Sequence, residues 1–177
     1  MKPSLWAAAI VCLVSSWAAP RQHHVDRMVA SADSGFLTKA AQGAMAAVEL
    51  GRLAVQKASN QNVKQLGRQM IEDFTRIQGP LKALATAKGV ALPTALDPGD
   101  QTLRTHLSRR SDRAFDRACI EAVVSNQKRV LAAFRHEANR GVDPDVKAYA
   151  AKELPALRDR LQSAGQILRQ MKKKKRK

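Results

Sequence analysis

Apolar residues recur every three or four positions along four long segments of the chain. These segments cover residues 36–58, 63–89, 112–139 and 144–171. Such spacing places apolar side chains on one face of an α-helix, whereas a strand would need alternation at every second position. No strand pattern competes with the helical one. The pattern therefore predicts an all-α protein with four long helices.

The first segment is rich in small residues. Its apolar face carries Phe36, Ala40, Ala44, Ala47, Gly51, Ala54 and Ala58. Small side chains allow a second helix to approach closely, and the second segment is the expected partner. Asp33 or Ser34 is predicted to cap the N-terminal end of this helix.

A break at residues 90–111 separates the four segments into two pairs. Prolines and glycines interrupt the helical pattern there, and residues 101–107 are predicted to form only a short helix. Shorter turns join the helices within each pair, which predicts two antiparallel hairpins. Two hairpins with a long connection between the second and third helices describe an antiparallel four-helix bundle. We expect the bundle to occupy residues 34–171.

The N-terminus has the form of an export signal. Lys2 supplies a positive charge, residues 5–14 form an apolar run, and the tripeptide "SWA" that ends at residue 18 is a small-x-small cleavage site. This predicts a signal peptide at residues 1–18, with cleavage after Ala19 as the alternative. Residues 19–33 then form a flexible segment before the bundle.

The segments that follow residue 18 predict a soluble mature protein outside the cytoplasm. None of them is apolar enough to span a membrane, so we expect a periplasmic or secreted chain without a transmembrane helix. Cleavage removes Cys12 and leaves Cys119 as the single cysteine. An intramolecular disulfide is thereby excluded, and Cys119 is predicted to be a small buried core residue.

The chain is strongly basic. Its 31 Lys and Arg residues against 15 Asp and Glu residues give a formal net charge of +16, which favours anionic partners. Aromatic residues make up only 4% of the chain, so a stacking platform for single-stranded nucleic acid is not expected. For an exported protein, anionic envelope polymers or a membrane surface are the expected partners, and nucleic acid is not.

Consecutive cations end the chain. A run of like charges cannot pack into a core, which predicts a mobile tail at residues 172–177 that binds anions. The tail consists of Lys172, Lys173, Lys174, Lys175, Arg176 and Lys177.

The sequence lacks the constellations that carry catalysis or metal binding. A di-iron bundle needs Glu-x-x-His pairs, which place a carboxylate and an imidazole on one inward face, and none is present. His136 and Glu137 are adjacent and hence about 100° apart, so only Glu137 points inward. Glu72 and Asp73 are explained by a solvated helix surface. With no glycine-rich phosphate loop and no nucleophile triad, we expect a non-enzymatic protein without cofactor or metal.

An arginine lies near the apolar face of the fourth helix. Leu157, Leu161 and Ala164 recur at helical spacing, and Arg160 lies close to the edge of their stripe. This position is typical of a ligand site, of a buried salt bridge, or of the border of a solvated face, because an arginine stem extends easily to solvent. The pattern leaves these three alternatives open.

Several segments, taken together and in order, resemble a known family. They are "FLTKAAQGAMAAVELGRLA", "VKQLGRQMIEDF", "GVALP", "AFDRA" and "AFRHEANRGVDPDVKAYAAKELPALRDRLQSA". From about Ser34 to Leu168 the chain resembles bacterial exported proteins with a ferritin-like four-helix domain of unknown function, often labelled predicted outer membrane protein. The resemblance implies a ferritin-like bundle and an association with the outer membrane.

The resemblance also marks four positions at which relatives carry potential metal ligands. In the family pattern a Glu precedes the Val-x-Leu-Gly step of the first helix, Asp-His pairs lie in the second and third helices, and a His follows Leu-Pro in the fourth. This sequence has other residues at these ligand positions: Ala47, Phe74, Asn126 and Arg160. Counting from the turns places Ala47 level with Phe74 and Asn126 level with Arg160. We therefore expect the four positions to meet in one layer.

An unpaired buried charge would be costly, so Arg160 needs a partner. We expect its guanidinium to hydrogen-bond Asn126 or a carboxylate such as Glu153. The whole sequence then predicts an exported, non-enzymatic helical bundle that binds anionic envelope components through its basic surface and tail. A metal-binding or redox protein of ferritin-like type is the alternative, which the four replaced ligands disfavour. Nothing in the sequence predicts the oligomeric state.

Overall fold

A computed structural model describes residues 31–174, and within this range the chain forms five α-helices and no strand. The helices are α1 (Ser31–Lys57), α2 (Gln61–Ala87), α3 (Pro98–Ser108), α4 (Asp112–Arg140) and α5 (Pro144–Lys174). The all-α prediction is confirmed for this part of the chain. Four long helices match the four predicted segments, and α3 is the short helix expected within the connection, so the count is five rather than four.

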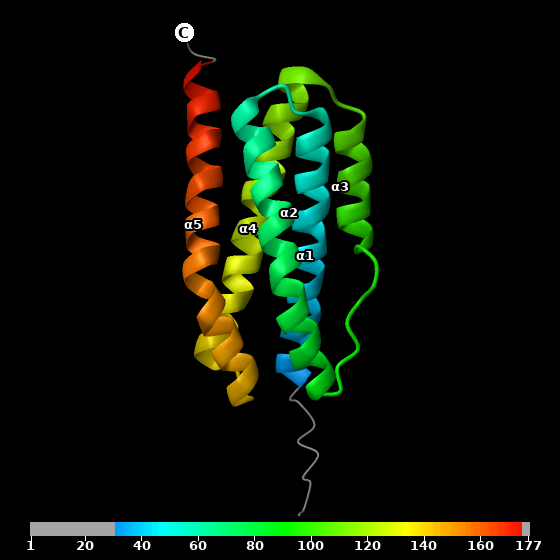
Figure 1. The fold of residues 1–177 in the computed structure, drawn as a ribbon, viewed down its shortest axis with the longest axis vertical. Helices are drawn as coiled ribbons and strands as arrows, with labels where there is room; N and C mark the ends of the chain where they lie inside the picture. The colour runs from blue at the N-terminus through cyan, green and yellow to red at the C-terminus, as the bar shows by residue number, and fades with distance from the viewer. Residues whose placement is uncertain (1–30, 175–177) are drawn as a thin grey trace, which may run out of the picture.

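The helices lie side by side along one long axis, with α5 at one outer side and α3 at the other (Figure 1). Helix α1 packs against both α2 and α4, and α5 packs chiefly against α4. Only a few contacts join α2 to α5. Among the four sides formed by the long helices, this one is therefore the least closely packed.

The hydrophobic core lies between the long helices and includes three phenylalanines that are almost fully buried, Phe74, Phe115 and Phe134. The ring of Phe134 meets that of Phe36 edge-on, with centroids 4.9 Å apart. Cys119 is buried in the same core, as predicted, and burial raises the pKa of its thiol to about 12. The thiol is therefore held in its unreactive neutral form.

Two glycines bring α1 and α2 together. A Cβ atom on Gly51 would lie 2.7 Å from the carbonyl oxygen of Gly67, and a Cβ atom on Gly67 would lie 2.7 Å from the carbonyl oxygen of Gly51. Any side chain at either position would push the two helices apart. The predicted close approach of the first two helices is confirmed.

Helix α1 starts earlier than predicted, and Asp33 lies inside its first turn. The buried carboxylate of Asp33 accepts hydrogen bonds from the backbone N–H groups of Val142, at 3.1 Å, and Asp143, at 2.8 Å. The prediction that Asp33 or Ser34 caps the N-terminal end of α1 is wrong, because both residues lie inside the helix. The Asp33 carboxylate instead accepts hydrogen bonds from backbone N–H groups of the turn between α4 and α5. Residues 31–33, predicted to be flexible, are helical.

The C-terminal prediction also needs correction. Helix α5 continues through Lys174, so the first three residues of the predicted tail, Lys172, Lys173 and Lys174, are helical. The three remaining cations, Lys175, Arg176 and Lys177, lie outside the described residues, as do the predicted signal peptide and residues 19–30. Within residues 31–174 no helix is long and apolar enough to cross a membrane.

A buried carboxyl group lies at the end of α4. The Glu137 side chain is only 2% exposed, and its Oε1 atom has no hydrogen-bond partner among the described residues. The pKa of Glu137 is raised to about 7, mainly by burial and also by the nearby carboxylates of Asp33 and Asp143, while Lys147 opposes the shift. The inward orientation predicted for Glu137 is confirmed, whereas neither Lys147 nor any other described residue bonds its Oε1.

Replacement of Glu137 by Gln should make the protein more stable at alkaline pH. The pKa of Glu137 in the folded chain lies above its ordinary value of 4.5. The contribution of this group to stability is therefore complete below pH 4.5 and is lost as the pH rises through 7. In urea unfolding, Glu137→Gln should exceed the wild type by roughly 1–3 kcal/mol at pH 8 and differ little at pH 5.

The exposed Glu72 provides the control for this measurement. Glu72→Gln should leave the pH dependence of the wild type unchanged, because Glu72 lies on the solvent side of α2. An advantage of Glu137→Gln that is equal at both pH values would contradict the assignment.

Candidate functional site

Arg160 forms an ion pair that links α5 to α2. Its side chain is 9% exposed, and Nε donates a hydrogen bond of 2.8 Å to Oδ2 of Asp73. The guanidinium carbon lies 5.0 Å from the centroid of the Phe74 ring, within the range of a cation–π contact. Of the three alternatives left open by the sequence, the structure has the buried salt bridge. The expectation of a carboxylate partner is confirmed, but the carboxylate is that of Asp73 and not Glu153, and the expected bond to Asn126 is wrong.

The partner comes from the edge of α2 because Asp73 and Phe74 are consecutive. Phe74 points into the core, and Asp73, whose side chain is 32% exposed, lies on the flank where α5 passes. The guanidinium of Arg160 thus contacts both residues at once. Its Nη1 atom is buried and has no hydrogen-bond partner within residues 31–173. Arg76 lies on the solvent side of the same carboxylate, 3.5 Å from Oδ1.

Asn126 faces α1 and α3 rather than α5. Its buried side-chain amide donates to the carbonyl oxygen of Gly43 at 3.3 Å and accepts from Arg129 at 3.1 Å. Arg129 also pairs with Asp100 of α3 at 3.1 Å. Burial raises the pKa of Asp100, although Arg129 opposes the shift. This network attaches α3 to the bundle and leaves Asn126 no role as a partner of Arg160.

The four positions marked by the family pattern are all buried: Ala47, Phe74, Asn126 and Arg160. Phe74 and Arg160 are in contact, and Asn126 bonds the backbone one turn before Ala47. Among residues 31–173, no group of three or more His, Cys, Asp or Glu side chains is placed to hold a metal ion. The structure thus brings Phe74 and Arg160 together, whereas the Asn126 amide bonds the backbone of α1 and does not contact Arg160 through any described hydrogen bond.

The Arg160–Asp73 pair should show a measurable coupling energy. In a double-mutant cycle with Arg160→Ala and Asp73→Ala, we expect a coupling of about 1–2 kcal/mol, because the guanidinium is largely shielded from water. Arg117 and Glu121 supply the control, since this i,i+4 pair on α4 is about half exposed on both sides. Its coupling should stay below about 0.5 kcal/mol. Equal couplings for the two pairs would show that Arg160 does not depend on Asp73.

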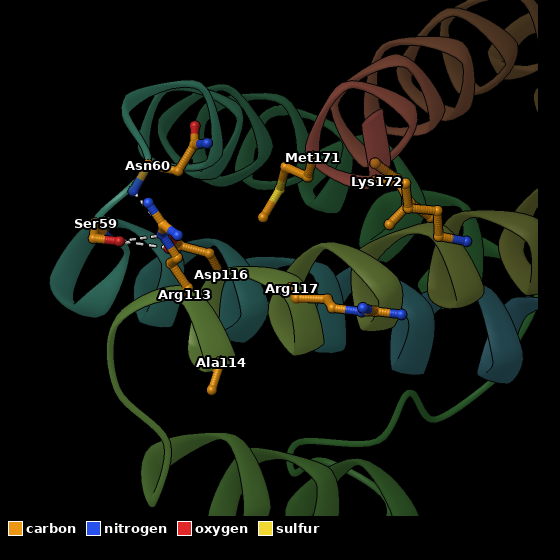
Figure 2. A pocket seen from close by; sticks show the side chains of 9 residues that line it. Ser59, Asn60, Arg113, Ala114, Asp116, Arg117, Met171 and Lys172 are labelled. Carbon is orange, nitrogen blue, oxygen red and sulfur yellow. Dashed lines mark hydrogen bonds between the residues drawn. The ribbon is translucent and has the colours of Figure 1, made fainter. Parts of the chain in front are cut away.

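A cationic pocket lies at the opposite end of the bundle from the α4–α5 turn. It has a volume of about 490 Å³ and lies where the last turns of α5 face the first turns of α4 and the turn between α1 and α2. Figure 2 shows the Met171 side chain pointing from α5 into the space between the helices. The residues that line this cationic pocket include Arg113, Arg117, Leu168, Met171 and Lys172.

The carboxylate in the cationic pocket is already engaged. Asp116 is 2% exposed and accepts hydrogen bonds from the backbone N–H groups of Ser59, at 2.9 Å, and Asn60, at 3.0 Å, and from the Ser59 hydroxyl at 2.5 Å. These bonds, drawn in Figure 2, hold the α1–α2 turn against α4. Asp116 is therefore a structural group of the turn.

The cations around the cationic pocket differ in their pairing. Arg117 bonds Glu121 at 3.1 Å. Arg113 and Lys172 have no acidic group within 4.0 Å among the described residues. Two positive charges consequently remain available for an external anion.

The sequence indicated the charge at this end through the tail but not the cationic pocket itself. Arg113 and Met171 are more than fifty residues apart in the sequence, and only the antiparallel packing of α4 on α5 brings them together. The sequence likewise predicts a solvated surface position for Asp73, because helical periodicity does not show which neighbouring helix passes a flanking residue. The one sequence feature that could have indicated Asp73 is its position next to Phe74, which the structure places in contact with Arg160.

Comparison with protein families finds a match over most of the chain. A family model described as Domain of unknown function (DUF4142) matches residues 18–167. No curated protein and no solved structure matches the chain.

Proposed function

The chain belongs to the family described as Domain of unknown function (DUF4142), and on that premise we propose that it is an exported, non-enzymatic helical protein that binds anionic envelope components. Binding takes place at the end of the molecule where α5 terminates, through the cationic pocket and the basic residues that follow it. The protein acts in the periplasm or as a secreted chain, in association with the outer membrane.

A ferritin-like four-helix arrangement is part of this proposal. Short turns join α1 to α2 and α4 to α5, and a long connection that contains α3 joins the two pairs. This order of short and long connections supports a bundle of two hairpins with α3 added on the outside of α1. The four long helices provide a rigid support for the charged end.

The single observation that carries the proposal is the charge at the cationic pocket. Arg113 and Lys172 have no acidic partner in the described part of the chain, and Lys173 follows directly on α5. The chain as a whole has a formal net charge of +16. A cluster of unpaired cations on a basic protein attracts anionic polymers and surfaces, with a strong dependence on salt.

Export can be tested by intact mass. The proposed signal peptide is removed on export. It consists of Lys2, the apolar run at residues 5–14 and the small-x-small site that ends at residue 18. Protein recovered from the envelope fraction of an expressing bacterium should have the mass of a chain that begins at Ala19, or at Pro20 if cleavage follows Ala19. A chain that retains Met1 and stays in the cytoplasmic fraction would refute export.

Anion binding can be tested with duplex DNA as a polyanionic probe. If all six cations of residues 172–177 engage phosphates, deletion of these residues should reduce the slope of log affinity against log salt by roughly 5. A variant that carries six Gln residues in their place provides a control of equal length and should behave like the deletion. An unchanged salt dependence in both variants would exclude binding through this segment.

A further inference from the structure

We propose that the cationic pocket binds the headgroup region of a single anionic phospholipid at a membrane surface. This inference rests on the proposed function and names the partner among the anionic envelope components. Arg113 and Lys172 hold the phosphate, and Leu168 and Met171 contact the first apolar carbons beyond it.

The positive side of the cationic pocket fits a phosphate group. Arg113 comes from α4 and Lys172 from α5, and both are exposed cations without an acidic partner among the described residues. An arginine provides several N–H donors in a fixed plane, and a lysine adds a compact charge, which together suit a phosphate oxygen cluster. The bonds to Asp116 from the α1–α2 turn keep the local carboxylate occupied.

The apolar side of the cationic pocket distinguishes a lipid from a polymer. Leu168 and Met171 are partly buried against the hydrophobic core, and both line the pocket. The volume of about 490 Å³ lies within the usual range of pockets for small organic ligands. A polysaccharide or nucleic acid would use the charges alone, whereas the acyl end of a phospholipid would also cover these two side chains.

The cationic pocket also lies where a membrane surface would reach it. Lys172 lines the pocket, and Lys173 and Lys174 follow it on the same helix. Clusters of basic residues beside an apolar contact bind anionic bilayers more tightly than either feature does alone. The end of α5 thus combines one lipid contact inside the pocket with the further charge of Lys173 directly after it on the helix.

The test uses the chain from residue 19 onward, which contains every described helix, and measures its binding to three probes. The probes are phosphatidylglycerol vesicles, phosphatidylcholine vesicles and heparin. Wild-type protein should bind phosphatidylglycerol vesicles and heparin but not phosphatidylcholine vesicles. Arg113→Gln should weaken binding to phosphatidylglycerol vesicles about fivefold, and Met171→Ser should weaken it roughly tenfold while heparin binding stays within about twofold.

Matched controls come from the other end of the molecule. Arg135 is an exposed cation 22 residues beyond Arg113 on α4, about 33 Å along the helix, and has no acidic partner within the described range. Val142 is a 73% exposed apolar residue in the α4–α5 turn. Arg135→Gln and Val142→Ser should each change vesicle binding less than twofold. Circular dichroism and urea unfolding test whether each variant is folded. If Met171→Ser does not fold, Leu168→Ser replaces it, because Leu168 also lines the pocket.

The outcomes separate the pocket from the general function. Equal effects of the pocket variants and their controls would overturn the lipid site and leave anion binding intact. A parallel loss of heparin and vesicle binding in Met171→Ser would assign the site to a polymer instead. Full competition by millimolar inorganic phosphate would assign it to the free ion. Wild-type protein that binds none of the three probes would overturn both proposals.

Discussion

The ion pair between Arg160 and Asp73 determines how the least closely packed side of the bundle is held. Helix α5 lies along α4 and meets α2 in only a few places. At the α4–α5 turn, Lys88 pairs with Asp143 at 2.7 Å and with Asp145 at 2.6 Å. Halfway along α5, Arg160 pairs with Asp73. Beyond Arg160 no side-chain hydrogen bond or ion pair within the described residues joins α5 to another helix, and there the cationic pocket opens.

A buried arginine contributes little net stability to a bundle, since apolar residues of similar volume often stabilise it as well. The ion pair instead sets the orientation of α5. The Arg160 guanidinium contacts a carboxylate at the edge of α2, Asp73, and the aromatic ring beside it, Phe74. It can reach both only when α5 has one rotation about its axis and one register along α2. That register also fixes where Leu168, Met171 and Lys172 meet α4 two to three turns later. The contact of Arg160 with Asp73 and Phe74 therefore positions the charged end of the molecule.

Helical periodicity predicted the long helices and the short α3 well, because each long segment has one continuous apolar face. The ends were predicted less well. The first turn of α1 is polar, and Asp33 is buried only because the distant α4–α5 turn uses its carboxylate. The last lysines of α5 continue a helix that periodicity ended at its last apolar residue. For the site, the sequence identified Arg160 as unusual but could not identify Asp73, because the choice between flanking carboxylates depends on the rotation of α5 about its axis.

The most direct test of this account is an NMR measurement of the Arg160 Nε–H group. The account predicts a resolved signal that exchanges slowly with water and shifts strongly in Asp73→Asn, since Nε donates to that carboxylate at 2.8 Å. The same signal should be nearly unchanged in Asn126→Ala and in Glu153→Gln. A signal that exchanges rapidly, or that responds to Asn126 or Glu153 and not to Asp73, would contradict the claim that this ion pair fixes α5 against α2.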